Sequence, residues 1–535
     1  MTKAPARRAC TNPVEDHMNV TRRSVLTSSA AIAAAAAMGF RPDQVLAAEG
    51  GTLRLAMSSD LGSLDPGYFT SLPAEIGTLF CCMPSLARPR QDANGTWGWE
   101  KTEFCETLEQ VDDLTINFAL KPGFIWSDGA GELTAEDVKF SFERMIGSDW
   151  GGRFEAFDRV DVTGTHTGTI VLKTPYVAIW MVALAYDSGF ILPKKAVEAL
   201  PDGRLTTSLP AQLGPYRFQE WIPQQKTVLV RNPDWTGTPA VFDSIEFVMV
   251  ADSKAGELAL QAGELDIAGL LPETAAGFDA APIPNTSFVN IPGTYYQWIG
   301  MNTEHPKLAD IKVRQAIQRG IDVDSCLAAA YSGLSPKATG IVPIGILGNR
   351  AQAGYSYDPA AAAALLAEAG VSGLSVTLHY NVSNNEDAVI AQVVQANLAD
   401  IGVTVELMPV DSGVYWNLGI EANGDDWKDL QLTIMAFRTG PDPLDAMQWF
   451  PAAQYGVWNW ERWKDDEFEA LWTAAIGEKD VAKRGQMYER MQEIMENTGA
   501  YVWITYPAVL YGVSTRVKPA FYPGGDYRAE EFTLA

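Results

Sequence analysis

Residues 374–408 read LSVTLHY-NVSNNED-AVIAQVVQANLADIG-VTVELM, and this stretch indicates the fold class. Its two ends, 374–380 and 403–408, have the β-branched and apolar composition of strands. Between them, 388–402 has the apolar spacing of a helix and ends at a glycine. Strand, helix and strand in this order form a βαβ unit, so the sequence predicts an α/β fold.

Strands and helices also alternate through the rest of the chain. A helix begins at Thr134, because Thr134 and Asp137 form a capping box in front of apolar residues at helical spacing. Since there is no fixed-period repeat and no long linker, we expect domains built from interwoven segments. At 535 residues the chain is long enough for two or three such domains. Further strands are predicted at 51–57, 114–120, 228–233 and 245–250, and further helices at 255–262, 311–320 and 359–370.

The composition excludes several classes of protein. Hydrophobic residues at 47% and charged residues at 20% are typical of a globular protein, not a disordered one. The net charge of −26 repels phosphate groups, so neither nucleic acid nor an anionic membrane is an expected partner. The 16 tryptophans suit a pocket that grips a ligand, although large cores would use them equally well.

The N-terminus predicts export. Arg22 and Arg23 precede an uncharged, alanine-rich stretch, a pattern that resembles a twin-arginine signal peptide. The stretch is short for a membrane span, and small residues offer a cleavage site near Ala47 or Ala48. Residues 1–47 are therefore predicted to be removed, which leaves the mature protein free in the periplasm.

Four cysteines follow this predicted signal: Cys81, Cys82, Cys105 and Cys326. In an oxidising compartment one of the first two can bridge to Cys105, but small buried thiols are an equal alternative. The sequence contains no C-x-x-C, so neither a zinc knuckle nor a thioredoxin-type redox site is indicated.

The sequence lacks the motifs of the common enzyme classes. It contains no G-x-S-x-G, no phosphate-binding G-K-[ST], no H-E-x-x-H and no G-x-G-x-x-G. His166, His305 and His379 are far apart in the sequence, and adjacent acids such as Asp465 and Asp466 are typical of a solvated face. We therefore predict no catalysis, no metal and no cofactor.

One family carries a similar series of motifs in the same order. The series is LDP at 64–66, WSDG at 126–129, LTAEDVKFSFER at 133–144, LGPYRF at 213–218, VRNPDW at 230–235, VRQAI at 313–317 and IGVTV at 401–405. From about Gly51 to the C-terminus, the chain resembles the peptide/nickel/opine family of periplasmic solute-binding proteins, the extracellular family 5 proteins of ABC importers.

This resemblance implies a two-lobed, type II-like periplasmic binding protein with a hinge-closing cleft. The first lobe is expected to comprise 48–93, 208–295 and 500–535, with 94–207 as an extra subdomain, and the second lobe to comprise 296–499. The implied partners are a small-molecule or peptide ligand and the membrane permease of an ABC importer. The protein is expected to act as a monomer.

The resemblance also points to a ligand-binding loop, 437–443, with the sequence FRTGPDP. Peptide-binding members typically carry an aspartate there that pairs with the α-ammonium group, and Thr439 stands at that position. Arg438 favours an anion instead, although a structural salt bridge is an equal alternative. Dipeptide-binding members use an arginine after the strand near Tyr380, and Asn381 occupies that place.

Aromatic residues complete the candidate site, although each one singly is more typical of a core. The predicted ligand-binding residues are Arg438, Thr439, Asp442, Asn381, Tyr296, Trp298, Trp416 and Trp449. The sequence thus predicts the binding component of an ABC importer for an oligopeptide or an opine-like solute. An oligosaccharide-binding member of the family is the first alternative, and an exported enzyme is the second.

Overall fold

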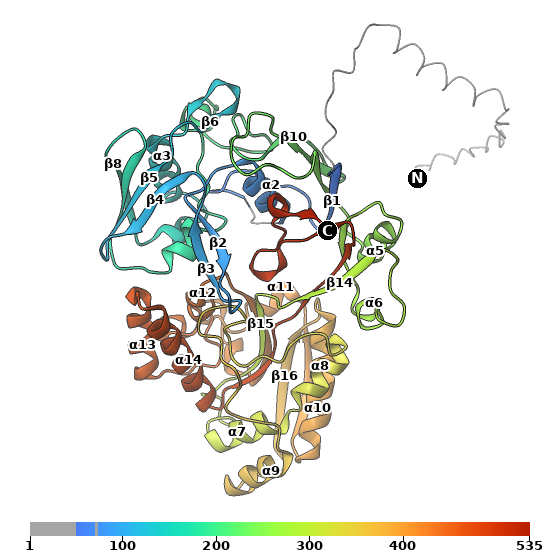
Figure 1. The fold of residues 1–535 in the computed structure, drawn as a ribbon. Helices are drawn as coiled ribbons and strands as arrows, with labels where there is room; N and C mark the ends of the chain where they lie inside the picture. The colour runs from blue at the N-terminus through green and yellow to red at the C-terminus, as the bar shows by residue number, and fades with distance from the viewer. Residues whose placement is uncertain (1–49, 70–72) are drawn as a thin grey trace, which may run out of the picture. The chain divides into compact units, whose positions relative to one another are not determined.

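Two large β-sheets dominate the computed structural model, which describes residues 50–69 and 73–535 (Figure 1). One sheet has seven strands and the other has five. Each sheet is the centre of one lobe, which confirms the predicted two-lobed α/β fold. The predicted signal peptide, 1–47, lies outside the described residues.

The seven-stranded sheet belongs to the first lobe. β1 (Thr52–Met57) pairs in parallel with β12 (Ser244–Met249), and Leu53 and Leu55 point into the core as their alternation predicts. The strand order is β10 (Tyr216–Ile222), β11 (Lys226–Arg231), β12, β1, β13 (Ile267–Gly269), β20 (Val509–Ser514) and β14 (Thr286–Ile291). Helix α2 (Pro73–Cys82) contacts β10 of this sheet, and helix α5 (Ser253–Gln261) contacts β13. The sheet therefore combines strands from distant parts of the chain.

A separate four-stranded antiparallel sheet lies within 94–207, the proposed extra subdomain. Its order is β4 (Cys105–Gln110), β5 (Thr115–Leu120), β9 (Thr167–Leu172) and β8 (Phe157–Val162). Helix α3 (Ala135–Met145) packs against β8. The backbone N–H of Thr134 donates to the Asp137 carboxylate at 2.9 Å, so the predicted capping box is present. The hairpin of β2 (Ala87–Gln91) and β3 (Trp97–Lys101) precedes this sheet.

The five-stranded sheet is the centre of the second lobe. Its order is β17 (Thr404–Val410), β16 (Ser375–Asn381), β18 (Leu432–Arg438), β15 (Tyr295–Met301) and β19 (Tyr501–Thr505). β16 and β17 run parallel and are joined by α10 (Asn385–Asp400), which confirms the βαβ unit. Figure 1 shows α7 (Ile311–Gly320), α8 (Val323–Tyr331), α9 (Pro359–Glu368) and α10 near this sheet.

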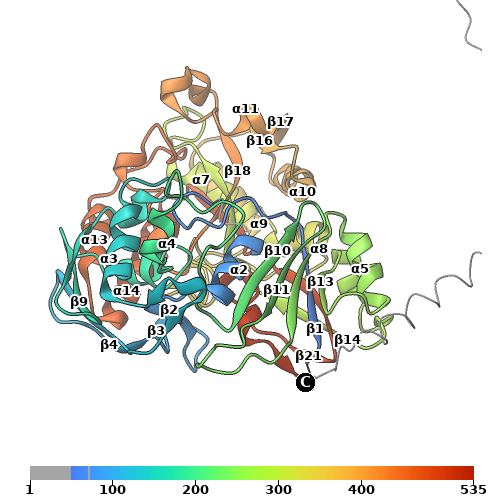
Figure 2. The ribbon, with the colours of Figure 1, turned by 90° about the horizontal axis from the view of Figure 1, so that it is seen from above.

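Helices α13 (Asp466–Gly477) and α14 (Val481–Asn497) lie beside the proposed extra subdomain (Figures 1 and 2). The backbone N–H of Val177 donates to the carbonyl oxygen of Ile476 at 2.9 Å. This hydrogen bond directly connects the two lobes.

One predicted boundary needs correction. The sequence assigns residues from 500 onward to the first lobe, but β19 pairs with β15 in the five-stranded sheet. The reason is burial, because Tyr501 and Trp503 are both enclosed in the core of the second lobe. The chain returns to the first lobe only at β20, and the last strand, β22 (Thr533–Leu534), pairs with β21 (Val517–Lys518) near the C-terminus (Figure 2).

Within residues 73–535 the chain crosses between the two large sheets twice. The first crossing joins β14 to β15 through 292–294, and the second joins β19 to β20 through 506–508. A Cβ atom added at Gly293 would lie 2.1 Å from the carbonyl oxygen of Pro507. The two crossings therefore lie against each other, and this close approach requires glycine.

The four cysteines of the described chain are all free and buried, so none forms a disulfide there. Burial raises the pKa of the Cys105 thiol to about 12, and it raises the pKa of Cys326 to about 12 as well. The sequence left open a disulfide to Cys105 or small buried thiols. In the structure the cysteines are small buried thiols.

Candidate ligand-binding cleft

A cavity of about 540 Å³ lies between residues of the two lobes. The proposed extra subdomain contributes Trp150, Arg153 and Tyr186 to its wall. The second lobe contributes the end of β18 and helix α12 (Pro443–Met447), together with the loop between them. This volume is typical of a site for a small organic molecule.

Arg438, the last residue of β18, lines the cavity and forms an ion pair across the two lobes. Its Nη2 donates to Oδ2 of Asp526 at 3.1 Å, and the hydroxyl of Tyr186 donates to the same oxygen at 3.2 Å. Burial raises the pKa of Asp526, while the Arg438 guanidinium opposes this rise. Of the two sequence interpretations of Arg438, the salt bridge is therefore present in the structure.

Arg153 lines the same cavity from the first lobe. Its guanidinium donates to the Asp187 carboxylate and, at 2.9 Å, to the hydroxyl of Ser188. The guanidinium carbon also lies 4.1 Å from the ring centroid of Trp150. These contacts fix the position of Arg153 at the edge of the cavity.

Asp445 of α12 is the acidic residue of the second lobe that faces the cavity. Burial raises the pKa of its carboxyl to about 7, and the nearby Arg153 acts in the opposite direction. The charges of Asp442 and Asp187 add to the rise, and the backbone N–H of Gly440 donates to the carboxylate.

Asp442 was predicted to bind ligand, but the structure gives it a structural role. Both of its carboxylate oxygens accept hydrogen bonds from Arg484, at 2.7 and 2.8 Å. One of them also accepts the backbone N–H of Leu444 at 2.9 Å and so caps α12. Since both side chains are about 5% exposed or less, this pair lies behind the cavity and not in its wall.

Thr439 lines the cavity, but its polar groups are engaged within the chain. Its backbone N–H donates to the carbonyl oxygen of Thr294 at 2.9 Å, and its hydroxyl donates to that of Gly440 at 3.0 Å. Thr439 therefore connects the ligand-binding loop to the first crossing between the lobes.

Tyr296 and Trp298 require a second correction, because they lie in the core of the second lobe. The hydroxyl of Tyr296 donates to the carbonyl oxygen of Ala446 at 2.9 Å, and the indole N–H of Trp298 donates to Glu461 at 2.7 Å. Each side chain is about 1% exposed. As residues i and i+2 of β15, they share the face that packs beneath α12 and do not line the cavity.

The other predicted residues divide between the cavity and its surroundings. Trp449 lines the cavity, and its indole N–H is buried without a hydrogen-bond partner among the described residues. Trp416 stacks on Phe437, with ring centroids 6.2 Å apart, and lies outside the cavity wall. Asn381 also lies outside it, and its side-chain amide donates to the hydroxyl of Ser412 at 3.1 Å.

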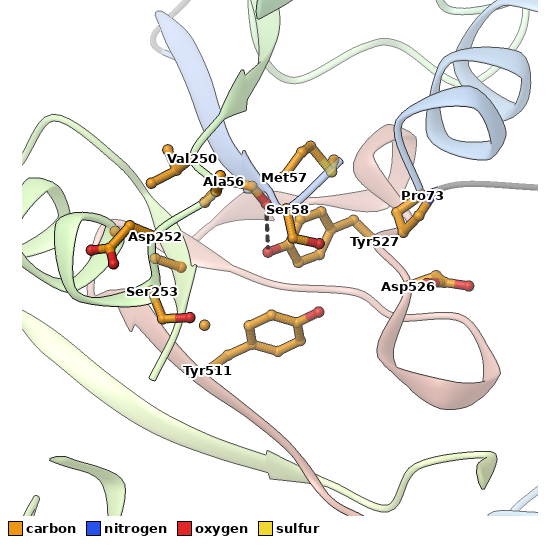
Figure 3. A pocket seen from close by; sticks show the side chains of 14 residues that line it. Ala56, Met57, Ser58, Pro73, Val250, Asp252, Ser253, Tyr511, Asp526 and Tyr527 are labelled. Carbon is orange, nitrogen blue, oxygen red and sulfur yellow. Dashed lines mark hydrogen bonds between the residues drawn. The ribbon is translucent and has the colours of Figure 1, made fainter. Parts of the chain in front are cut away.

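Figure 3 shows a smaller cavity of about 150 Å³ at the end of β1 in the first lobe. Side chains of Ser58, Asp252 and Tyr511 surround it, and the hydroxyl of Tyr527 donates to the carbonyl oxygen of Ala56 at 3.2 Å. Asp526, the partner of Arg438, also borders this smaller cavity. It therefore lies beside the 540 Å³ cavity.

Sequence analysis did not identify Arg153, Asp187, Asp445 and Asp526. Asp445 lies two residues beyond the predicted loop 437–443, so its closeness in sequence could have identified it as a residue of the site. The other three occur in segments without a recognised motif, and only the fold brings them to the loop.

Within residues 50–69 and 73–535, no cluster of three or more histidine, cysteine or acidic side chains is arranged to hold a metal ion. No helix in the same residues has the length and apolar character needed to cross a membrane.

A two-lobed α/β chain with a cavity between its lobes has the architecture of a periplasmic-type binding protein. The family model for bacterial extracellular solute-binding proteins, family 5 (middle part), matches residues 102–461. The chain therefore belongs to this family.

Relatives and solved structures agree with this assignment. The dipeptide-binding protein of Escherichia coli K12 is 27% identical over 459 residues, which cover 78% of this chain and 82% of that protein. The structure of HbpA2 from Haemophilus parasuis has a TM-score of 0.79 at 22% identity and covers 91% of this chain and 100% of its own. MoaA from A. tumefacien R10, solved with mannopinic acid, has a TM-score of 0.67 at 22% identity, with coverage of 91% and 99%.

Proposed function

We propose that this protein is the exported binding component of an ABC importer and captures a peptide or an amino-acid-derived, opine-like solute. The observation that carries the proposal is the 540 Å³ cavity, because both lobes line it and both contribute charged groups. Arg438 and Asp445 place charges of opposite sign on one wall. Such a wall suits a solute that carries both a cationic and an anionic group.

The relatives support the same class of solute. One is named a dipeptide-binding protein, and one solved structure holds mannopinic acid. The relatives are solute-binding proteins and not enzymes, which favours capture and delivery to a membrane permease over catalysis. We further propose that the protein acts as a periplasmic monomer after export through the paired Arg22 and Arg23.

An oligosaccharide is the second candidate solute. Trp150 and Trp449 line the cavity, and flat indole rings offer apolar area to the faces of sugar rings. The paired and unpaired charges in the same wall favour the peptide or opine class, since a neutral sugar would leave them without a complementary charge.

Thermal unfolding of the mature protein with a solute panel tests the proposal. The panel contains peptides, opines and oligosaccharides, and native mass spectrometry of the purified protein identifies any solute that remains bound. A true ligand at one hundred times its Kd should stabilise the folded state by about 3 kcal/mol. If no member of the panel changes the unfolding midpoint, solute capture is contradicted. Chemical turnover of any member would also contradict it.

A further inference from the structure

A third cavity, of about 760 Å³, lies beside the first crossing between the lobes. We call it the crossing cavity. Its walls come from the tip of the β2–β3 hairpin (91–97), the first crossing with the end of β14 (291–294), the loop 344–349, Glu489 of α14 and the segment 519–524. It shares no lining residue with the 540 Å³ cavity or with the cavity at the end of β1. The crossing cavity is therefore a further space that both lobes enclose.

The walls of the crossing cavity meet across the two lobes. The backbone N–H of Trp97 donates to the carbonyl oxygen of Gly345 at 2.8 Å, so the hairpin of the first lobe reaches a loop of the second (Figure 1). A Cβ atom added at Gly345 would lie 3.1 Å from the carbonyl oxygen of Gly95, which shows how closely the two loops approach. Any rotation of one lobe about the crossings would change the distance between these walls.

Thr294 connects the crossing cavity to the candidate cleft. It lines the crossing cavity, and a Cβ atom added at Gly524 would lie 2.6 Å from its hydroxyl oxygen. Its carbonyl oxygen accepts the backbone N–H of Thr439, a residue that lines the 540 Å³ cavity, at 2.9 Å. The two cavities therefore share one short segment of backbone.

The wall of the crossing cavity is almost free of charge. Among its described residues, Glu489 is the single lysine, arginine, histidine or acidic residue, and its side chain is exposed, where water screens its charge. An anion entering this cavity would find no cation, and a cation would find only this solvated carboxylate. The 540 Å³ cavity differs, because Arg153, Arg438 and Asp445 line it. The crossing cavity thus favours an uncharged ligand.

The polar groups of this wall are amides and hydroxyls. The amides belong to Gln91, Asn94 and Asn349, and the hydroxyls to Thr96 and Thr294. The amide nitrogen of Asn349 donates to the carbonyl oxygen of Val342 at 2.7 Å, while no described residue donates to its amide oxygen. Such groups both donate and accept hydrogen bonds without a net charge, so they suit a ligand rich in hydroxyl groups.

Two aromatic rings complete the wall. Trp97 lines it from the hairpin and Phe521 from the segment near the C-terminus, and both are half-buried. Phe521 is fixed by stacking on Tyr511, with ring centroids 5.4 Å apart. Flat apolar rings beside uncharged polar groups offer a sugar ring both a face to lie on and partners for its hydroxyls.

We propose that the crossing cavity binds an uncharged carbohydrate and that the bound carbohydrate holds the two lobes in the arrangement of this structure. This inference goes beyond the proposed function, because the carbohydrate is an effector and not the captured solute. A ligand that contacts both lobes stabilises the arrangement in which its contacts are complete. By linkage, a solute in the 540 Å³ cavity that favours the same arrangement and the carbohydrate bind each other's complex more tightly.

A matched set of disaccharides tests the site in the mature protein. Cellobiose, maltose and trehalose are uncharged, and cellobiouronic acid adds one carboxylate to the cellobiose frame. Calorimetry gives the Kd of each for wild type, for Trp97→Ala and Thr96→Trp in the crossing cavity, and for the control Trp449→Ala in the 540 Å³ cavity. Circular dichroism confirms that each variant is folded, and Thr96→Trp fills the cavity from its rim without removing a packed ring.

Hydrogen exchange tests the effect on the lobes. The backbone N–H of Val177 donates to the carbonyl oxygen of Ile476 in the other lobe, and neither residue lines the crossing cavity. If the carbohydrate holds the lobes together, the lobes separate only after it dissociates. At ten times the Kd, exchange of the Val177 amide should then be about tenfold slower.

The proposal predicts that at least one uncharged disaccharide binds and that cellobiouronic acid binds at least tenfold more weakly than cellobiose. Trp97→Ala and Thr96→Trp should each lose at least tenfold in affinity, and Trp449→Ala should behave like wild type. In wild type the bound disaccharide should slow exchange at Val177.

Four outcomes would overturn the proposal. Binding of no disaccharide removes the site and leaves solute capture in the 540 Å³ cavity intact. Equal binding of cellobiouronic acid removes the preference for an uncharged ligand. A loss of affinity in Trp449→Ala but not in Trp97→Ala or Thr96→Trp places the sugar in the 540 Å³ cavity, as the captured solute. Binding that leaves the exchange of Val177 unchanged removes the effect on the lobes.

Discussion

The buried pair of Arg484 and Asp442 gives the sharpest stability prediction. Replacing Arg484 by methionine removes two hydrogen bonds to Asp442, at 2.7 and 2.8 Å, a third to the carbonyl oxygen of Ala475 at 3.0 Å and a fourth to the hydroxyl of Tyr488 at 3.3 Å. The aspartate then keeps only the backbone N–H at the start of α12 as a donor. Breaking such a pair from one side costs about 3 to 5 kcal/mol, because it leaves an uncompensated buried charge.

Differential scanning calorimetry measures this loss in the mature protein. For a lobe of about 200 residues, a loss of this size lowers the unfolding midpoint by about 10 °C. The double variant Asp442→Asn/Arg484→Met should recover part of the loss, since it no longer buries a charge. The control is Arg490→Met on the same helix, because Arg490 forms an exposed pair with Glu467 and should change stability by less than about 1 kcal/mol.

Equal changes of the midpoint in Arg484→Met and Arg490→Met would contradict this prediction. A double variant less stable than Arg484→Met would contradict it as well. Either result would mean that the pair is not what holds α12 in place. Because α12 carries Asp445, a real loss at Arg484 should also weaken solute binding.

Three further predictions concern other parts of the chain. Burial raises the pKa of Glu461 to about 7, so its contribution to stability is present at pH 4.5 and is lost as the pH rises through 7. The unfolding midpoint should therefore fall less between pH 5.5 and pH 8 in Glu461→Gln than in wild type, and equal slopes would contradict the assignment. Gly293→Ala should cost about 1 to 3 kcal/mol, because the new Cβ would lie 2.1 Å from a carbonyl oxygen of the second crossing, whereas Gly147→Ala meets no atom within 4 Å and should be close to neutral. Replacing Arg22 and Arg23 by lysine should hold the precursor in the cytoplasm, and a normal periplasmic yield of this variant would exclude the twin-arginine route.

The fold could be predicted because its signals are local. The strand and helix periodicities of 374–408 predicted β16, α10 and β17, and the capping box at Thr134 predicted the start of α3. The boundary at residue 500 could not be found in this way. β19 is a buried strand with no local mark of the lobe that it joins, and its place is decided by packing against β15.

The site could be predicted only in part, because its ion pairs join distant residues. Arg438 and Asp526 are 88 positions apart, and Asp442 and Arg484 are 42 apart. A sequence shows that Arg438 is charged, but not that a carboxylate from the other lobe already faces it. The prediction that Tyr296 and Trp298 bind ligand was wrong for a related reason. The alternation of side chains along β15 does not show which face of the strand lines the cavity and which packs in the core.

Hydrogen exchange with and without a bound solute shows whether one solute contacts both lobes in the 540 Å³ cavity. We expect simultaneous protection of 149–187 from the first lobe and 438–449 from the second. Protection confined to the smaller cavity, at 252–256 and around Tyr511, would contradict it.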